Sequence, residues 1–200
     1  MTSPALHLDF PHNWSAQILS ARPLILPSRN FTYPAQAEEV ERGALELLVT
    51  PEPHEHSPSA QDSPSAKDSF LATCALGFAN PIVPSGVWSS PHPEEICAVA
   101  GGYAYLICTT EPQRFTFLEM RPVLAVHPAV DAGLLLFVGH RNILAWGAQG
   151  LAWQSPKLSD EGLTVTSIQG DHLHGIGWNM FTDKETPFTL NLTSGHLKTL

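Results

Sequence analysis

From residue 69 onward, short apolar segments alternate with turn residues such as Gly, Pro, Asn and Asp. The segments are rich in β-branched and aromatic side chains, and turn signals recur roughly every 8–12 residues, a spacing typical of sandwiches, barrels and propellers. None of them carries a clean helical stripe. The pattern therefore predicts an all-β fold of antiparallel meanders. The expected strands are 70–78, 86–90, 95–100, 103–109, 114–119, 122–127, 133–139, 142–147, 150–155, 162–170, 172–178 and 187–192.

The part before residue 69 is less regular. Residues 1–35 contain prolines throughout and are expected to wrap the body as irregular chain, with one short strand at 22–26. In residues 35–49 a helical stripe (Val40, Ala44, Leu47 and Leu48) competes with a strand over 43–50, and the strand is favoured because the remainder is so strongly β. Residues 51–68 contain four Pro and four Ser with almost no large apolar side chain, which predicts a flexible loop. Residues 1–200 are expected to form a single domain.

Two segments 39 residues apart are similar to each other. Residues 99–107 and 138–146 both consist of an apolar strand, a Gly-containing turn and a second strand. A third copy begins at residue 163. A period of this length with three or four strands per unit is typical of β-propeller blades.

The stretch LLLFVGHRNILAWGAQGLAWQS (134–155) resembles a blade of the quinoprotein-like β-propellers, and PFTLNLTSGH (187–196) is similar to the end of such a blade. The resemblance extends over residues 95–196. It implies a blade-like meander architecture and supplies no active site or cofactor motif. Successive hairpins that form a two-sheet β-sandwich remain the alternative.

The composition excludes several partners. A net charge of −9 does not suit a nucleic-acid-binding surface. No apolar run approaches the ~20 residues of a membrane span, so no membrane partner is expected. The N-terminus does not read as a secretory signal. Cys74, Cys97 and Cys108 lie in apolar runs without a CxxC spacing, which predicts buried, reduced thiols and a cytoplasmic protein.

The sequence carries no nucleophile elbow, phosphate loop, dinucleotide fingerprint or zinc-protease motif. The interpretation therefore leans against an enzyme, and no cofactor is expected. The pairs Glu94-Glu95 and Asp160-Glu161 adjoin Pro or Gly. They are interpreted as solvated turns rather than as an acid–base pair, which needs two carboxylates facing one cleft.

His172 and His174 are the candidate metal ligands. On a strand they would lie on the same face, about 7 Å apart, and imidazole suits divalent metals such as zinc or copper. His127 or His140 would be a third ligand. The favoured alternative is a hairpin turn at 170–171 that places both histidines on a solvated face. The motif His-Glu-His at 54–56 is interpreted as part of the polar loop.

Trp146 and Trp153 are the candidate ligand-binding aromatics. They flank a Gly-containing turn and could stack on one face of a hairpin. Such a pair, or Trp178, would form a platform for a sugar or a peptide, whereas the favoured alternative is a core aromatic pair.

Together these observations predict a non-catalytic interaction or scaffold module with a protein partner and an acidic surface. The alternatives are a metal-binding protein or metal-dependent enzyme that uses His172 and His174, and a carbohydrate-binding module that uses its tryptophans.

Overall fold

A computed structural model of the chain describes residues 4–35, 42–52, 68–78 and 83–198. The chain divides into two compact units, Met1–Glu119 and Met120–Leu200, and each is considered by itself below. Almost all regular structure is β, and consecutive strands that pair with each other do so antiparallel, which confirms the all-β prediction. Among the described residues, no helix is long and apolar enough to cross a membrane.

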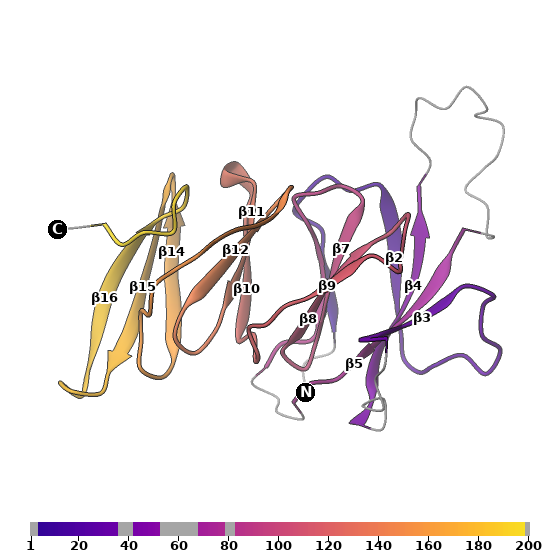
Figure 1. Cartoon of the computed structure of the whole chain (residues 1–200), viewed down its shortest axis with the longest axis horizontal. Coiled ribbons are helices and arrows are strands. Elements are labelled where there is room, and N and C mark those ends of the chain that lie inside the picture. Colours follow the sequence, from indigo (N-terminus) through magenta and orange to yellow (C-terminus); the bar gives the residue numbers. More distant parts are fainter. Residues whose placement is uncertain (1–3, 36–41, 53–67, 79–82, 199–200) are drawn as a thin grey trace. The chain divides into compact units, whose positions relative to one another are not determined.

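The first unit contains two sheets (Figure 1). One has the strand order β2-β4-β5-β3 and the other β1-β6-β7-β8-β9. The strands are β1 (Ala5–His7), β2 (Trp14–Leu19), β3 (Asn30–Tyr33), β4 (Ala44–Pro51), β5 (Phe70–Ala75), β6 (Gly86–Ser89), β7 (Glu95–Ala100), β8 (Tyr103–Cys108) and β9 (Phe115–Phe117). The favoured strand over 43–50 is thus confirmed as β4, except that Gly43 precedes it.

A shared apolar core joins the two sheets of the first unit. Leu47 and Phe70 contribute to it from one sheet, and Ile96 and Tyr105 from the other. Tyr105 is fully buried, and its hydroxyl donates to the carbonyl of Ala75 at 2.9 Å. The buried hydroxyl is thereby satisfied, which removes the cost of burying an unpaired polar group.

The N-terminal residues differ from the expectation. Residues 1–35 were expected to be irregular apart from a strand at 22–26, but they contain β1, β2 and β3, while 22–26 is a loop. β1 pairs parallel with β6, and β3 pairs parallel with β5. Such pairings are invisible to local patterns, because they join segments far apart in the chain. The prediction of a strand at 22–26 is wrong, because this apolar run pairs with no other strand of the described residues.

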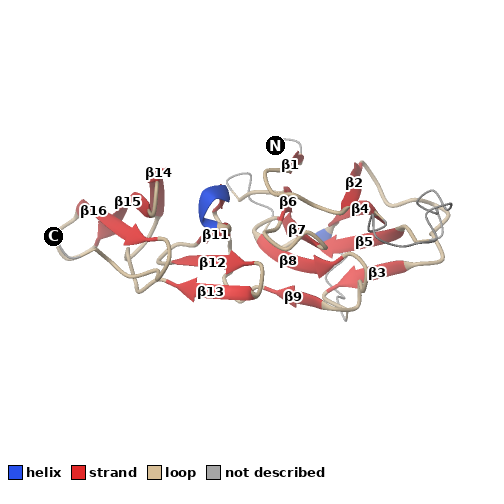
Figure 2. Ribbon diagram, turned by 90° about the horizontal axis from the view of Figure 1, so that it is seen from above, coloured by secondary structure: helices blue, strands red, loops and turns tan. Residues whose placement is uncertain are grey.

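The second unit also contains two meander sheets, β10-β11-β12-β13 and β14-β15-β16 (Figure 2). The elements are β10 (Ala125–Ala129), the one-turn helix η2 (Val130–Ala132), β11 (Leu134–Val138), β12 (Ile143–Gly147), β13 (Gly150–Gln154), β14 (Leu163–Gln169), β15 (His172–Asn179) and β16 (Lys184–Asn191). Every strand expected between residues 70 and 192 is therefore present.

The core of the second unit uses alternate residues of β11. Leu134, Leu136 and Val138 pack with Leu173 and Leu190 of the neighbouring sheet. A strand places successive side chains on opposite faces, so one face of β11 supplies this core. Leu135 and Phe137, on the other face, are also fully buried. β11 is covered on both sides, as its continuous apolar run suggests.

The internal repeat corresponds to the central hairpins of two sheets. Residues 99–107 span the end of β7, the Gly101-Gly102 turn and most of β8, with Ala100 paired to Tyr103. Both glycines have positive φ (56° and 78°), which side-chain-bearing residues rarely adopt. Residues 138–146 likewise join β11 to β12. The expected flexible loop at 51–68 falls mostly on 53–67, which lie outside the described residues.

Gly177 in β15 gives a test of the packing in the second unit. A Cβ there would lie 2.3 Å from the carbonyl oxygen of Leu158, whereas at Gly147 in β12 the nearest atom would be 3.6 Å away. We expect Gly177→Ala to destabilise the protein by about 1–3 kcal/mol through overpacking, and Gly147→Ala to have a smaller effect. Urea unfolding of the full chain measures both. Equal midpoints for the two variants would contradict the packing described here.

Candidate functional site

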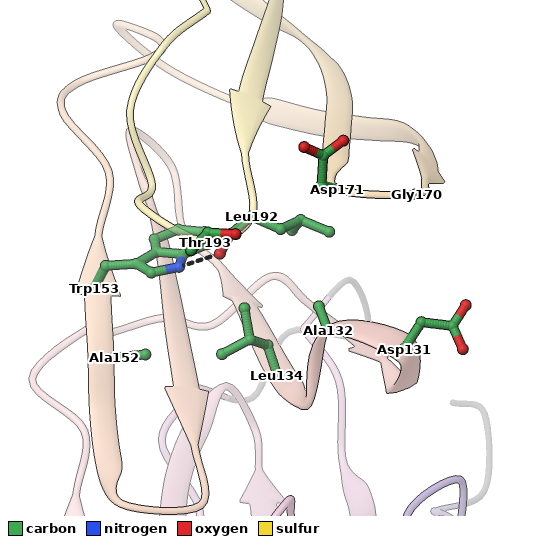
Figure 3. Close-up of a pocket in the computed structure, with 9 residues that line it drawn as sticks. All are labelled: Asp131, Ala132, Leu134, Ala152, Trp153, Gly170, Asp171, Leu192 and Thr193. Carbon is green, nitrogen blue, oxygen red and sulfur yellow. Dashed lines mark hydrogen bonds between the residues drawn. The ribbon is translucent and has the colours of Figure 1, made fainter.

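A shallow hollow of about 400 Å³ lies in the second unit (Figure 3). It is formed by η2, the end of β13, the β14–β15 turn and the segment after β16. Its lining residues are Asp131, Ala132, Leu134, Ala152, Trp153, Gly170, Asp171, Leu192 and Thr193. Leu134, Trp153 and Leu192 are buried and the others are exposed, so an apolar floor is surrounded by an exposed rim.

Two carboxylates provide the charge of this hollow. Asp131 is exposed on η2, and Asp171 is exposed in the two-residue turn between β14 and β15. Asp171 contacts the next residue, since Nδ1 of His172 lies 2.5 Å from its Oδ1. Two exposed acids beside an apolar floor do not form the nucleophile–base arrangement that covalent catalysis needs. The hollow instead suits weak contact with a side chain that has an apolar body and a positive end.

Trp153 is one wall of the hollow, and its position is fixed by structural contacts. Its indole Nε1 donates to the carbonyl oxygen of Leu192 at 2.6 Å. Gly195 lies so close to the ring that a Cβ there would be 2.5 Å from it. Trp153 therefore fastens the segment after β16 to β13.

The structure does not place Trp146 and Trp153 on one face of the hairpin, as a stack of the two rings requires. Ala145 pairs with Leu136 on one side and Trp153 on the other, and residues directly opposite each other share a face of a sheet. Trp146 pairs with Leu135, so it lies on the opposite face. The two indoles therefore do not form one platform, and ligand binding by either stays a prediction.

His172 and His174 do lie on one face of β15, as expected. Their ring centroids are 6.4 Å apart and the rings are inclined by 21°. Nδ1 of His174 lies 3.0 Å from the hydroxyl of Thr189, and Nδ1 of His172 contacts Asp171. Only the two Nε2 atoms remain for a metal, which is fewer than the three protein ligands of ordinary zinc sites.

The proposed third ligands do not join this pair. His127 belongs to β10, where burial lowers its pKa, and His140 is exposed between β11 and β12. Within the part of the chain that the structure describes, no three His, Cys, Asp or Glu side chains are grouped to hold a metal. Residues 54–56 lie outside that part.

The three cysteines are free and buried, but their surroundings differ. Burial raises the pKa values of Cys74 and Cys97, as expected for inert core thiols. Cys108, at the end of β8, is 7% exposed and adjoins the turn that leads to β9. This turn places three kinds of hydrogen-bond donor around its sulfur.

The turn stabilises the thiolate of Cys108. Burial alone would raise the pKa, but the Thr110 hydroxyl, the backbone N–H groups of Glu111 and Thr110, and Arg114 together lower it. The Thr110 Oγ1 atom lies 3.3 Å and the Arg114 Nη2 atom 3.0 Å from Sγ. Donors to a charged acceptor favour its ionised form. The prediction of three buried thiols is confirmed, but the sequence did not reveal the hydrogen-bond donors that lower the pKa of Cys108.

We expect this difference to appear in alkylation by iodoacetamide, followed by mass spectrometry across a pH series. Because the thiolate is the nucleophile, the rate at Cys108 should reach half of its maximum at a lower pH than for an ordinary thiol. Arg114→Gln should move that midpoint to higher pH, and Arg141→Gln, in the other unit, should not. The midpoint is used because steric hindrance by neighbouring side chains lowers the alkylation rate by the same factor at every pH and so leaves the midpoint unchanged. An unmoved midpoint in Arg114→Gln would contradict the role of the guanidinium.

The metal hypothesis has its own test. It expects a stoichiometric divalent metal in the purified full chain and its loss from His174→Ala, measured by elemental analysis. Purified protein without stoichiometric metal would contradict it.

No family model and no curated protein matches this chain. Similar solved structures include a Saccharomyces cerevisiae Dbp5 variant bound to Nup159, a Gle1 variant, IP6 and ADP, with TM-score 0.38, 12% identity, and coverage of 97% of this chain and 52% of that chain. Another is the N-terminal domain of Nup159, with TM-score 0.37, 11% identity, and coverage of 99% and 53%. This chain thus spans about half the length of those chains. TM-scores of this size do not establish a shared fold, so no property of those proteins is transferred here.

Proposed function

We propose that this chain is a non-catalytic protein-interaction module and that the loop between β2 and β3 is its principal contact. The observation that carries the proposal is the exposure of two adjacent aliphatic side chains in that loop. Leu24 is fully exposed and Ile25 is 89% exposed. Burying a side chain of this size contributes about 1.5–3 kcal/mol, and contiguous exposed apolar side chains mark interaction sites.

The base of this loop is held in place. The side-chain amide of Asn30 donates to the carbonyl of Pro27 at 3.1 Å. The Arg29 guanidinium donates to the carbonyl of Asp68 and lies 5.9 Å from the centroid of the Phe70 ring. Pro23 and Pro27 flank the apolar residues, and each fixes its own φ. A loop restricted in this way loses less conformational freedom when it docks.

The charges near the loop indicate what it would contact. Arg22 and Arg29 are the only charged residues between Asp9 and Glu38, although the whole chain carries −9. The loop is therefore locally basic. An apolar groove with acidic residues at its edge, on a partner protein, matches both features, because complementary charge at the rim steers association.

The double substitution Leu24→Ser/Ile25→Ser tests the proposal, with Leu151→Ser in β13 as the matched exposed control. Partners would be captured with the full chain from cells that express it, then purified and titrated against each variant. We expect the double variant to bind at least about tenfold more weakly, as hot-spot losses do, and Leu151→Ser to bind like the natural chain.

Two outcomes would contradict the proposal. One is a set of captured proteins whose affinities do not change in the double variant. The other is co-sedimentation with anionic lipid vesicles that depends on Leu24 and Ile25, because that would make a bilayer the occupant.

A further inference from the structure

The turn between β15 and β16 combines a fixed backbone with exposed apolar side chains. β15 ends at Asn179 and β16 begins at Lys184, and these two residues pair across the sheet. In the turn, Phe181 is 89% exposed and Met180 is 57% exposed. Polar or Gly residues would reverse the chain equally well, so the reversal itself does not require an aromatic side chain here.

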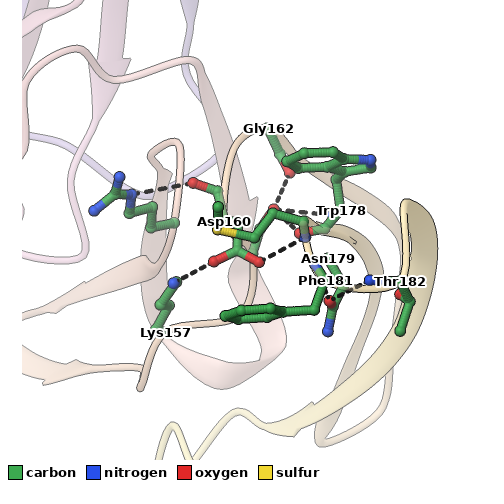
Figure 4. Close-up of polar contacts among 10 residues, drawn as sticks. Lys157, Asp160, Gly162, Trp178, Asn179, Phe181 and Thr182 are labelled. Carbon is green, nitrogen blue, oxygen red and sulfur yellow. Dashed lines mark hydrogen bonds and ion pairs between the residues drawn. The ribbon is translucent and has the colours of Figure 1, made fainter.

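Side chains from two directions hold the backbone of this turn (Figure 4). Oδ1 of Asn179 accepts from the N–H groups of Phe181 at 3.0 Å and Thr182 at 3.2 Å. Oδ2 of Asp160 accepts from the N–H of Met180 at 2.8 Å. Three successive N–H groups are therefore bonded to side chains, as in Asx-type turns.

Asp160 is itself fixed. Its N–H donates to the carbonyl of Trp178 at 2.8 Å, and the Nε of Arg141 donates to its carbonyl at 3.1 Å. The Lys157 ammonium bonds its other carboxylate oxygen. These contacts lower the pKa of Asp160, with the Lys157 bond the largest cause. The residue that accepts from the turn, Asp160, is therefore itself hydrogen-bonded to β15.

The fixed backbone changes what docking would cost. Association loses affinity to the ordering of loops and side chains at the interface. Here the backbone is ordered on folding, while the apolar side chains remain available. Buried aromatic anchors of this kind commonly dominate interface energies.

The ionisable groups around the turn help to select the occupant. The basic groups of this region are Arg141, Lys157 and Lys184, and the acidic groups are Asp160, Glu161, Asp183 and Glu185, which leaves a net charge of −1. This region is therefore locally acidic, within a chain of net charge −9. An anionic bilayer would be repelled by like charge, and so would an acidic face of a second copy of the chain. A protein surface with basic residues around an apolar pocket would be attracted.

We propose that the Met180–Phe181 turn is a preordered anchor that inserts Phe181 into a basic-rimmed apolar pocket of a partner protein. This contact is separate from the loop at Leu24 and Ile25, and it uses residues of the second unit alone.

The test begins with a photoreactive phenylalanine analogue placed at residue 181 of the full chain, in cells that express the protein. The same analogue at Leu151, an exposed position in the same unit, is the matched control. A protein crosslinked from 181 and not from 151 would then be purified and titrated with variants. Phe181→Ser should weaken its binding about tenfold or more, and higher ionic strength should weaken binding by the natural chain.

Asn179→Ala separates preordering from contact, because it keeps Phe181 and removes the acceptor for two N–H groups. It should weaken binding several-fold, and unchanged binding would overturn the preordering. A lack of crosslinking specific to residue 181, or unchanged binding by Phe181→Ser, would overturn the anchor itself. The variant Leu24→Ser/Ile25→Ser should bind this partner like the natural chain, so failure of one contact leaves the other separately testable.

Discussion

The structure depends on strands that are buried on both faces, whereas β15, at the centre of its sheet, buries alternate residues only. All residues of β5 and β11 are buried, so a single meander cannot be stable with one face in water. Within each unit two sheets meet around one shared core, which covers one face of each. Because burial of apolar surface is the dominant favourable term in folding, this constraint determines which residues point inward and leaves the turns free to vary.

The turns are accordingly where the distinctive chemistry lies. Cys108 acquires its stabilised thiolate from donors in the β8–β9 turn, and Phe181 acquires a fixed position from acceptors around the β15–β16 turn. In both cases hydrogen bonds from outside the strand pairing fix the polar groups of a turn. A rigid sheet thus carries local geometries that a flexible segment of the same sequence would not hold.

Strand positions were predictable because they depend on local order: apolar runs bounded by turn residues identify them wherever partners are consecutive. The parallel pairing of β3 with β5 was not, because it joins distant segments. At residues 22–26 this prediction was wrong, because an apolar run can also lie in an exposed loop. The common face of His172 and His174 was predictable, because side chains two residues apart on a strand point the same way. The opposite faces of Trp146 and Trp153 were not predictable, because a register shift after Ala145 changes which residues lie opposite each other. The lowered pKa of Cys108 was not predictable either, because it depends on how the following turn places the Thr110 hydroxyl, two backbone N–H groups and Arg114 around the sulfur.

The two proposed contacts differ in the charge that surrounds an apolar tip. Arginines flank Leu24 and Ile25, whereas near Phe181 the carboxylates outnumber the basic groups by one. Apolar burial supplies affinity with little discrimination, while charge at the rim penalises the wrong partner. One patch of uniform charge on a partner would be attracted to one tip and repelled by the other. The two proposed contacts are therefore suited to different surfaces, and binding at both would bring those surfaces together.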